Sequence, residues 1–133
     1  MITERRKLGD LGEEIAANYL KSKGYRILAR NYQKPWGEID IVAKLPTVSR
    51  ETFANRGETL AFIEVKSQKV AVEALLPEEN VHYFKKKRLE KAVLSYLAEN
   101  KYPEETDWQI DVIAVEIDLK TRKANVRHIP NAF

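Results

Sequence analysis

Helical and strand-like hydrophobic spacing follow one another along this chain in an order that leaves few architectures open. Apolar residues recur every three or four positions over about residues 3–23 and 78–100, which predicts two helices. Alternating or continuous apolar runs predict five strands, over residues 25–32, 38–45, 59–67, 108–118 and 124–129. The order α-β-β-β-α-β-β predicts an α/β domain in which one central mixed sheet is flanked by helices.

The length and composition indicate one folded unit. A chain of 133 residues has the usual size of a single domain and can bury a core without disulfides or metals. Hydrophobic residues make up 44% and charged residues 32%, which is typical of a folded domain and argues against disorder. No repeat or linker divides the sequence, so we expect a single domain over residues 1–133.

The residue types exclude several kinds of site. The chain has no cysteine, which excludes disulfides, thiolate zinc sites and cysteine nucleophiles. Its two histidines, His82 and His128, are far apart in sequence, so any metal should be held by oxygen ligands, which favours Mg²⁺ or Mn²⁺. No apolar run approaches the ~18 residues of a membrane span, and the N-terminal residues lack a signal-peptide core. We therefore expect a cytoplasmic protein.

Two expected strands carry charged residues on one face of an apolar backbone. Within residues 38–43 this face contains Asp40, and within residues 61–66 it contains Glu64 and Lys66. The opposite faces carry Ile39, Ile41 and Ala43 in the first strand and Ala61, Ile63 and Val65 in the second.

These charged residues have a chemical use if the two strands form an antiparallel hairpin, because Asp40 and Glu64 can then converge on one point. Two carboxylates can hold Mg²⁺ against a phosphate group. Lys66 would lie beside Glu64, where it could orient or deprotonate the attacking water or neutralise the transition state. The alternative is an ordinary cross-strand ion pair on a solvated face.

Each expected helix also turns one charged residue toward the body of the protein. Glu13 aligns with small residues such as Ala16, whereas Glu14 aligns with polar residues. Glu13 is therefore a candidate third carboxylate, and a helix-surface glutamate is the alternative. On the second helix Lys85 lies four positions before Leu89, within the apolar stripe. It could reach a polar site or simply extend along the stripe's edge.

The distribution of basic residues is more informative than their number. A formal net charge of +3 and a pI near 9.0 are weak evidence for a nucleic-acid partner. A dense basic run suits a phosphate backbone better, and it consists of Lys85, Lys86, Lys87 and Arg88. A solvated helix face is the alternative interpretation of this run.

Asp111 lies in a run that is apolar on both faces, so its carboxylate needs a partner. We expect a structural ion pair there rather than catalysis. Trp36 and Trp108 are expected to be turn or core residues, and His82 and His128 to be surface or packing residues.

Many of these residues belong to short motifs spread over nearly the whole chain. The motifs are Gly9-x-x-Gly12-Glu13, Arg30-Asn31-Tyr32, Gly37-Glu38-Ile39-Asp40, Phe62-Ile63-Glu64-Val65-Lys66, Lys85-x-x-Arg88-Leu89, Asp111-Val112-Ile113-Ala114 and His128-Ile129-Pro130-Asn131-Ala132-Phe133. With them the chain resembles the bacterial UPF0102 (YraN-like) family, whose members are predicted to be related to endonucleases.

The resemblance implies a restriction-endonuclease-like (tRNA-endonuclease-like) fold of the PD-(D/E)XK superfamily, related to archaeal Holliday junction resolvases. Glu13 then matches the helix acid of the pattern, Asp40 the "D", and Glu64 and Lys66 the "ExK". The implied function is a metal-dependent endonuclease that acts on DNA, including branched or structured DNA, with Mg²⁺ or Mn²⁺ held by Asp40, Glu64 and Glu13. A homodimer is expected by analogy. A non-catalytic nucleic-acid-binding or protein-interaction module with the same fold is the alternative.

Two positions depart from the family's pattern. Gln109 stands two residues before Asp111, and Gln68 two residues after Lys66, where the family usually has arginine. These differences could weaken phosphate contacts, or they could leave Asp111 with a different partner. The segment 46–58 also looks longer than is common in the family.

Overall fold

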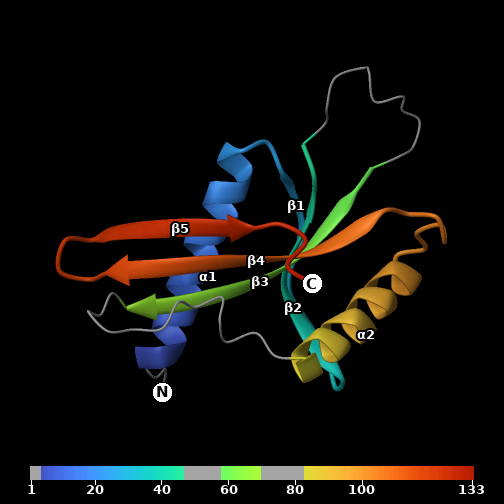
Figure 1. Ribbon diagram of the computed structural model, residues 1–133, viewed down its shortest axis with the longest axis horizontal. Coiled ribbons are helices and arrows are strands. Elements are labelled where there is room, and N and C mark those ends of the chain that lie inside the picture. The colour runs from blue at the N-terminus through green and yellow to red at the C-terminus, as the bar shows by residue number, and fades with distance from the viewer. Residues whose placement is uncertain (1–3, 47–57, 70–82) are drawn as a thin grey trace.

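The computed structural model describes residues 4–46, 58–69 and 83–133 (Figure 1). The elements, in chain order, are α1 (Glu4–Ser22), β1 (Arg26–Lys34), β2 (Gly37–Lys44), β3 (Leu60–Lys69), α2 (Tyr83–Glu99), β4 (Trp108–Asp118) and β5 (Lys123–Ile129). The predicted element order is confirmed. The expected start of the second helix near residue 78, and most of the expected loop 46–58, lie outside the described residues.

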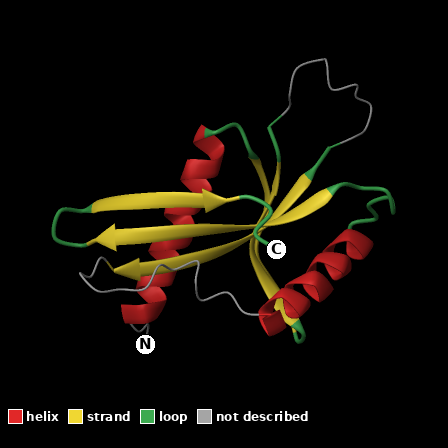
Figure 2. Cartoon of the chain, in the orientation of Figure 1, coloured by secondary structure: helices red, strands yellow, loops and turns green. Residues whose placement is uncertain are grey.

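The strands form one five-stranded sheet in the order β1-β2-β3-β4-β5. Neighbouring strands are antiparallel except β3 and β4, which are parallel and are separated in the chain by α2, as a parallel connection requires. The sheet is therefore mixed, and with its two helices it has the expected α/β, restriction-endonuclease-like layout (Figure 2). Within the described residues, no helix is long and apolar enough to span a membrane.

Each helix covers one side of the sheet with its own buried cluster. The α1 cluster combines small and branched residues, including Ala16, Ala17, Leu20, Ile41, Ile63 and Val115. The α2 cluster is richer in aromatic residues and includes Leu89, Val93, Tyr96, Val42, Phe62 and Ile110. Since adjacent strand residues such as Ile41 and Val42 fall in different clusters, the alternation expected along the strands is present over most of the sheet.

The alternation fails at Ile39, because β2 and β3 separate there. Their ladder contains four residue pairs, from Lys44 opposite Leu60 to Ile41 opposite Ile63. Beyond this point β2 continues with β1 toward α2, while β3 continues beside β4 (Figure 1). Ile39 consequently packs in the α2 cluster and not with Ile41, so the prediction that these two residues share a face is wrong.

A buried polar network fastens the C-terminal residues to β4. Asp111 is fully buried and accepts hydrogen bonds from Gln109 Nε2 at 2.9 Å and from the backbone N of Asn131 at 3.0 Å. Its other oxygen lies 2.8 Å from His128 Nε2. The expectation of a structural partner for Asp111 is confirmed, and Gln109 is one of its partners. His128 packs edge-on against the rings of Tyr19 and Tyr25, as expected of a packing residue, and its ring also pairs with this carboxylate, which the sequence did not indicate.

Asp111→Ala should destabilise the protein by about 1–3 kcal/mol for each buried donor that loses its acceptor. The loss arises because Gln109, His128 and the Asn131 amide would all be left without their shared acceptor. Urea denaturation measures it. Glu105→Ala, at an exposed position, serves as the control and should change the free energy of unfolding by no more than about 0.5 kcal/mol. Equal effects of the two substitutions would contradict a structural role for Asp111.

Candidate active site

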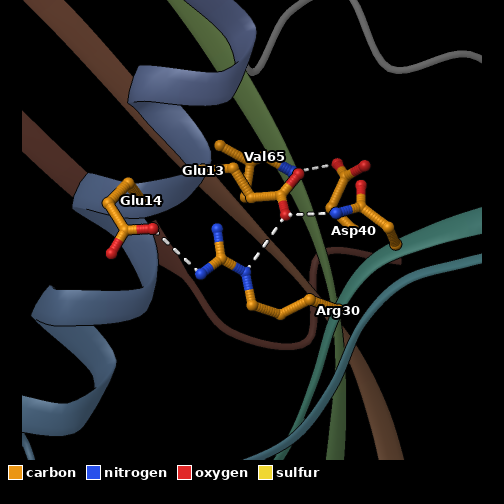
Figure 3. Close-up of polar contacts among 6 residues, drawn as sticks. Glu13, Glu14, Arg30, Asp40 and Val65 are labelled. Carbon is orange, nitrogen blue, oxygen red and sulfur yellow. Dashed lines mark hydrogen bonds and ion pairs between the residues drawn. The ribbon is translucent and has the colours of Figure 1, made fainter.

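Asp40 lies at the first position after the ladder between β2 and β3 ends. The last pair is Ile41 opposite Ile63, so the next residues on the two antiparallel strands are Asp40 and Glu64. Asp40 Oδ2 accepts a hydrogen bond from the backbone N of Val65 at 2.7 Å (Figure 3). The antiparallel pairing that the sequence analysis required is therefore present, and a carboxylate bridges the two strands where they separate.

The surroundings of Asp40 disfavour its charged form. Burial, together with the nearby carboxylates of Glu64, Glu13 and Glu38, raises the pKa of this carboxyl from 3.8 to about 6. The hydrogen bond from Val65 acts in the opposite direction. The fold thus places several acidic groups close enough to oppose the ionisation of Asp40, which a bound cation would relieve.

Glu64 is the most enclosed acid of the site, with a residue exposure of 6%. Its Oε1 pairs with Lys66 Nζ at 3.3 Å and with Lys85 Nζ from α2. Its Oε2 is buried and has no hydrogen-bond partner among the described residues. A buried carboxylate oxygen without a partner is costly, and such an atom is a common sign of a site that takes up water or an ion.

The two lysines beside Glu64 differ in their affinity for a proton. Burial lowers the pKa of Lys66, and the hydrogen-bonded neighbour Lys85 lowers it further, against the attraction of Glu64. Burial also opposes the charge on Lys85, but hydrogen bonds to Glu64 and Lys66 outweigh it and raise the pKa of Lys85. Lys66 is consequently the lysine that can more readily exchange a proton.

Glu13 reaches the same region from α1. It is buried, and its Oε1 accepts hydrogen bonds from Arg30 Nε at 3.2 Å and from Asn31 Nδ2 at 3.0 Å (Figure 3). Glu14 is exposed and pairs with Arg30 at 3.0 Å. The expected inward direction of Glu13 and outward direction of Glu14 are both present. In Figure 3 the carboxylates of Glu13 and Asp40 lie near each other between α1 and the strands.

Gly12 allows α1 to come this close to β3. A Cβ built at this position would lie 1.7 Å from Ser67 Oγ, so any larger residue would push the helix away from the strand. Since Glu13 is the next residue, the glycine controls how far its carboxylate reaches toward Asp40. This explains the Gly12-Glu13 part of the first motif.

Arg30 and Asn31 also belong to this site, although only their shared motif marked them in the sequence. Arg30 pairs with Ile41 and Tyr32 with Ile39, which places Asn31 opposite Asp40 on the neighbouring strand. Asn31 has a φ of 55°, a left-handed conformation that asparagine tolerates better than most residues. The motif Arg30-Asn31-Tyr32 was a signal in the sequence, but nothing local revealed that Glu13 would be their partner.

The structure gathers Asp40, Glu64, Lys66 and Lys85 and brings Glu13 to their edge. Within the described part of the chain, no set of three histidine, cysteine or acidic residues is arranged to hold a metal ion. The basic run divides between several environments. Lys85 pairs with Glu64, Lys86 Nζ lies 5.9 Å from the centre of the Phe133 ring, and Lys87 and Arg88 are exposed.

Comparison with known sequences places these motifs in a family. The model of "Uncharacterised protein family UPF0102" matches residues 12–115, a range that runs from the glycine before Glu13 through Asp111 and on along β4. The chain belongs to the UPF0102 family. The resemblance inferred from the motifs is therefore confirmed.

Relatives in this family align over nearly their whole length. A UPF0102 protein of Moorella thermoacetica is 38% identical over 133 residues, covering 100% of both chains. One from Alkaliphilus oremlandii is 36% identical over 128 residues, covering 96% of this chain and 98% of its own. A third, from Trichlorobacter lovleyi, is 39% identical over 126 residues, covering 95% of this chain and 89% of its own.

Asp40→Asn should make the protein more stable at neutral pH, without added metal. The pKa of Asp40 is raised to about 6 in the folded protein, so its stabilising contribution is present below its ordinary pKa and is lost as the pH rises through 6. Asparagine keeps the acceptor for Val65 but carries no charge. The gain at about pH 8 should approach ~3 kcal/mol, from about two units of pKa, and vanish near pH 4.

Urea denaturation across this pH range in the presence of a chelator measures the difference. Glu105→Gln removes an exposed carboxylate and should leave stability nearly constant at each pH. A variant at Asp40 that is less stable than the unaltered protein at neutral pH would show that the charged form is favoured by the fold.

Proposed function

We propose that this UPF0102 protein is a metal-dependent endonuclease that hydrolyses phosphodiester bonds in DNA, including branched or structured DNA. The observation that carries the proposal is the buried Glu64 Oε2, which lacks a hydrogen-bond partner among the described residues and belongs to a carboxylate facing the Asp40 position. A purely structural ion pair has no need for an enclosed, unpaired oxygen beside a second acid whose charge is already disfavoured.

The residues present fit Mg²⁺ or Mn²⁺. Mg²⁺ is usually held by one or two protein carboxylates, with waters and substrate phosphate oxygens completing its shell. Asp40 and Glu64 would be those ligands, and a cation between them would offset the repulsion that raises the pKa of Asp40. Glu13 adds negative charge nearby, and its assignment as a third ligand stays a prediction. When bound, the metal would activate a water molecule and neutralise charge on the phosphate.

The remaining residues have roles that follow from their contacts. Lys66 has a lowered pKa and lies beside Glu64, so its Nζ is suited to hold or accept a proton of the attacking water. Lys85 keeps its charge more firmly and would stabilise negative charge on the phosphate. Arg30 and Asn31 fix the carboxylate of Glu13 and thus act as positioning residues.

A second candidate is a nucleic-acid-binding or protein-interaction module that keeps the fold but does not cut. The pairing of Glu64 with both Lys66 and Lys85 favours it, because two lysines already balance the acid without any metal. Without a metal, however, the acids Asp40 and Glu64 would repel a DNA backbone. The two candidates therefore differ in whether the acidic pair binds a cation.

Asp40→Asn should abolish metal-dependent cleavage of DNA and leave the affinity for DNA without metal unchanged or higher. The substitution removes a negative charge beside the phosphate and keeps the shape of the side chain. Lys66→Ala should lower cleavage by about 10²–10⁴-fold, the range for losing a proton-transfer group, and should weaken binding because a positive charge is lost. Cleavage assays on linear, flap and junction DNA, and anisotropy titrations in a chelator, measure both quantities.

Lys69→Ala is the matched control, since it removes an exposed lysine from the same strand. Calorimetric titration with Mn²⁺ separates the two candidate functions, because only the nuclease should bind the ion and lose it on Asp40→Asn. A protein that binds DNA but takes up no Mn²⁺ would support the non-catalytic module. Cleavage that survives both active-site substitutions would rule out this site as its source.

Removing Lys86 and Lys87 together by alanine substitution should weaken binding to duplex DNA and flatten its salt dependence. Each lost phosphate contact reduces the magnitude of the slope of log affinity against log salt by about 0.9. The loss of two contacts should therefore reduce it by up to about 1.8. The control is the Lys120→Ala, Lys123→Ala pair at the exposed β4–β5 turn, which removes the same charge. If both pairs change the slope equally, the α2 run is a solvated face without a specific role.

A further inference from the structure

A pocket of about 350 Å³ lies between the β1–β2 turn and the first turns of α2. The residues that line it include Lys34, Trp36, Glu38, Lys85 and Arg88. Its volume is at the lower end of the roughly 300–1,000 Å³ typical of small-ligand pockets. It is therefore suited to one ring and its attached phosphate, and it is too small for a stacked base pair.

Trp36 provides an aromatic surface that is both open and fixed. The residue is 42% exposed, although a tryptophan at a hairpin turn could have been buried against the helix. Its Nε1 donates a hydrogen bond to Ser95 Oγ on α2 at 3.0 Å, and this hydroxyl donates in turn to the Lys91 carbonyl at 3.0 Å. The indole is held at its polar edge while part of its surface stays available, which is the form of a stacking platform.

The turn itself is pressed against the helix backbone. A Cβ at Gly37 would lie 2.5 Å from the Arg88 carbonyl oxygen, so only glycine allows this contact. The approach keeps the residue next to Trp36 in place relative to Arg88. The two sides of the pocket are thus positioned by backbone contact and do not depend on side chains alone.

The cations of the pocket are not equally available to a ligand. Lys34 pairs with Glu99 at 2.6 Å, and Lys85 pairs with Glu64. Arg88 is exposed and has no ion-pair partner within the part of the chain that the structure describes. A phosphate would therefore be drawn toward Arg88, while the carboxylate of Glu38, which also lines the pocket, would repel it.

The pocket adjoins the acidic site, formed by Asp40 and Glu64, through shared residues. Lys85 lines the pocket and also pairs with Glu64, and Glu38 lines it and also raises the pKa of Asp40. A nucleic-acid strand whose phosphate lies at Asp40 and Glu64 would have a neighbouring nucleotide within reach of Trp36. The pocket therefore lies beside the strand's path and not on a separate surface.

We infer that this pocket binds one unpaired nucleotide of the DNA substrate, with its base stacked on Trp36 and a phosphate held by Arg88. The inference rests on the proposed function and narrows its substrate class. In a continuous duplex both faces of each base are covered by neighbouring bases, so a base can stack on a side chain only where it is unpaired or turned out of the helix. The substrate should then contain a single-stranded segment next to the bond that is cut.

The test compares a short single-stranded DNA oligonucleotide with a duplex of the same sequence, by fluorescence anisotropy in a chelator. Trp36→Ala should weaken single-strand binding roughly 5- to 150-fold, the value of one stacked base, and should change duplex binding less than about twofold. Trp36→Phe should keep most of the single-strand affinity. Arg88→Gln should weaken single-strand binding and lower its salt slope by about 0.7, one phosphate contact.

Trp108→Phe is the matched control, because Trp108 packs edge-on against Phe62 in the α2 cluster and is absent from the pocket lining. This variant also leaves Trp36 as the single tryptophan of the chain, so its fluorescence should be quenched when the single strand is added. The quenching needs no substitution at Trp36 and tests the stacking even if Trp36→Ala fails to fold.

The outcomes separate this inference from the proposed function. If the unaltered protein binds DNA but Trp36→Ala binds single strand and duplex with unchanged affinity, or the fluorescence is not quenched, the pocket assignment is wrong and the nuclease proposal stands. Equal losses of affinity for single strand and duplex would also overturn the pocket assignment, because Trp36 would then not distinguish an unpaired base from a paired one. If the unaltered protein binds neither DNA, whether in the chelator or with added Mn²⁺, the proposed function fails and the pocket assignment fails with it.

Discussion

The hydrogen bond from the Val65 amide to Asp40 Oδ2 is the contact on which the candidate site depends. It spans the point where β2 and β3 stop pairing, and it replaces the backbone contact that the ladder no longer supplies. The separation lets β2 run to α2 while β3 runs beside β4, and the acids emerge between them (Figure 1). A continuous ladder would have left Asp40 and Glu64 as an ordinary cross-strand pair with no space between the strands.

Burying so many charges is tolerable because each acid has a basic or amide neighbour supplied by a different element. Glu13 is held by Arg30 and Asn31 of β1, and Glu64 by Lys66 of β3 and Lys85 of α2. Such networks rarely stabilise a fold more than apolar packing would. The raised pKa of Asp40 and the unpaired oxygen of Glu64 therefore both lower the stability of the folded protein. Such a loss is usual where buried polar groups serve binding or chemistry.

The sequence predicts the order of helices and strands well, because the hydrophobic periodicity of an element is summed over all its residues and does not depend on any one of them. It also predicts that Asp40 and Glu64 lie close together, because the alternation of side chains and the antiparallel pairing of the two strands suffice for that. It could not predict that Ile39 changes cluster, since the end of a ladder depends on where another helix packs. The pairing of His128 with Asp111 and the left-handed backbone of Asn31 were equally hidden, because both depend on partners far away in the chain.

The first turns of α2 show how consecutive basic residues can serve different parts of a molecule. At 100° per residue, neighbours on a helix point in different directions. Lys85 meets Glu64, Lys86 lies over the Phe133 ring, and the Arg88 carbonyl contacts the hairpin at Gly37. One helical segment thus joins the acidic site, the C-terminal residue and the pocket. A small shift of α2 would alter all three together. Under the proposed function, a cation at Glu64 and a nucleotide beside Trp36 would therefore be energetically coupled, with Lys85 as the shared group.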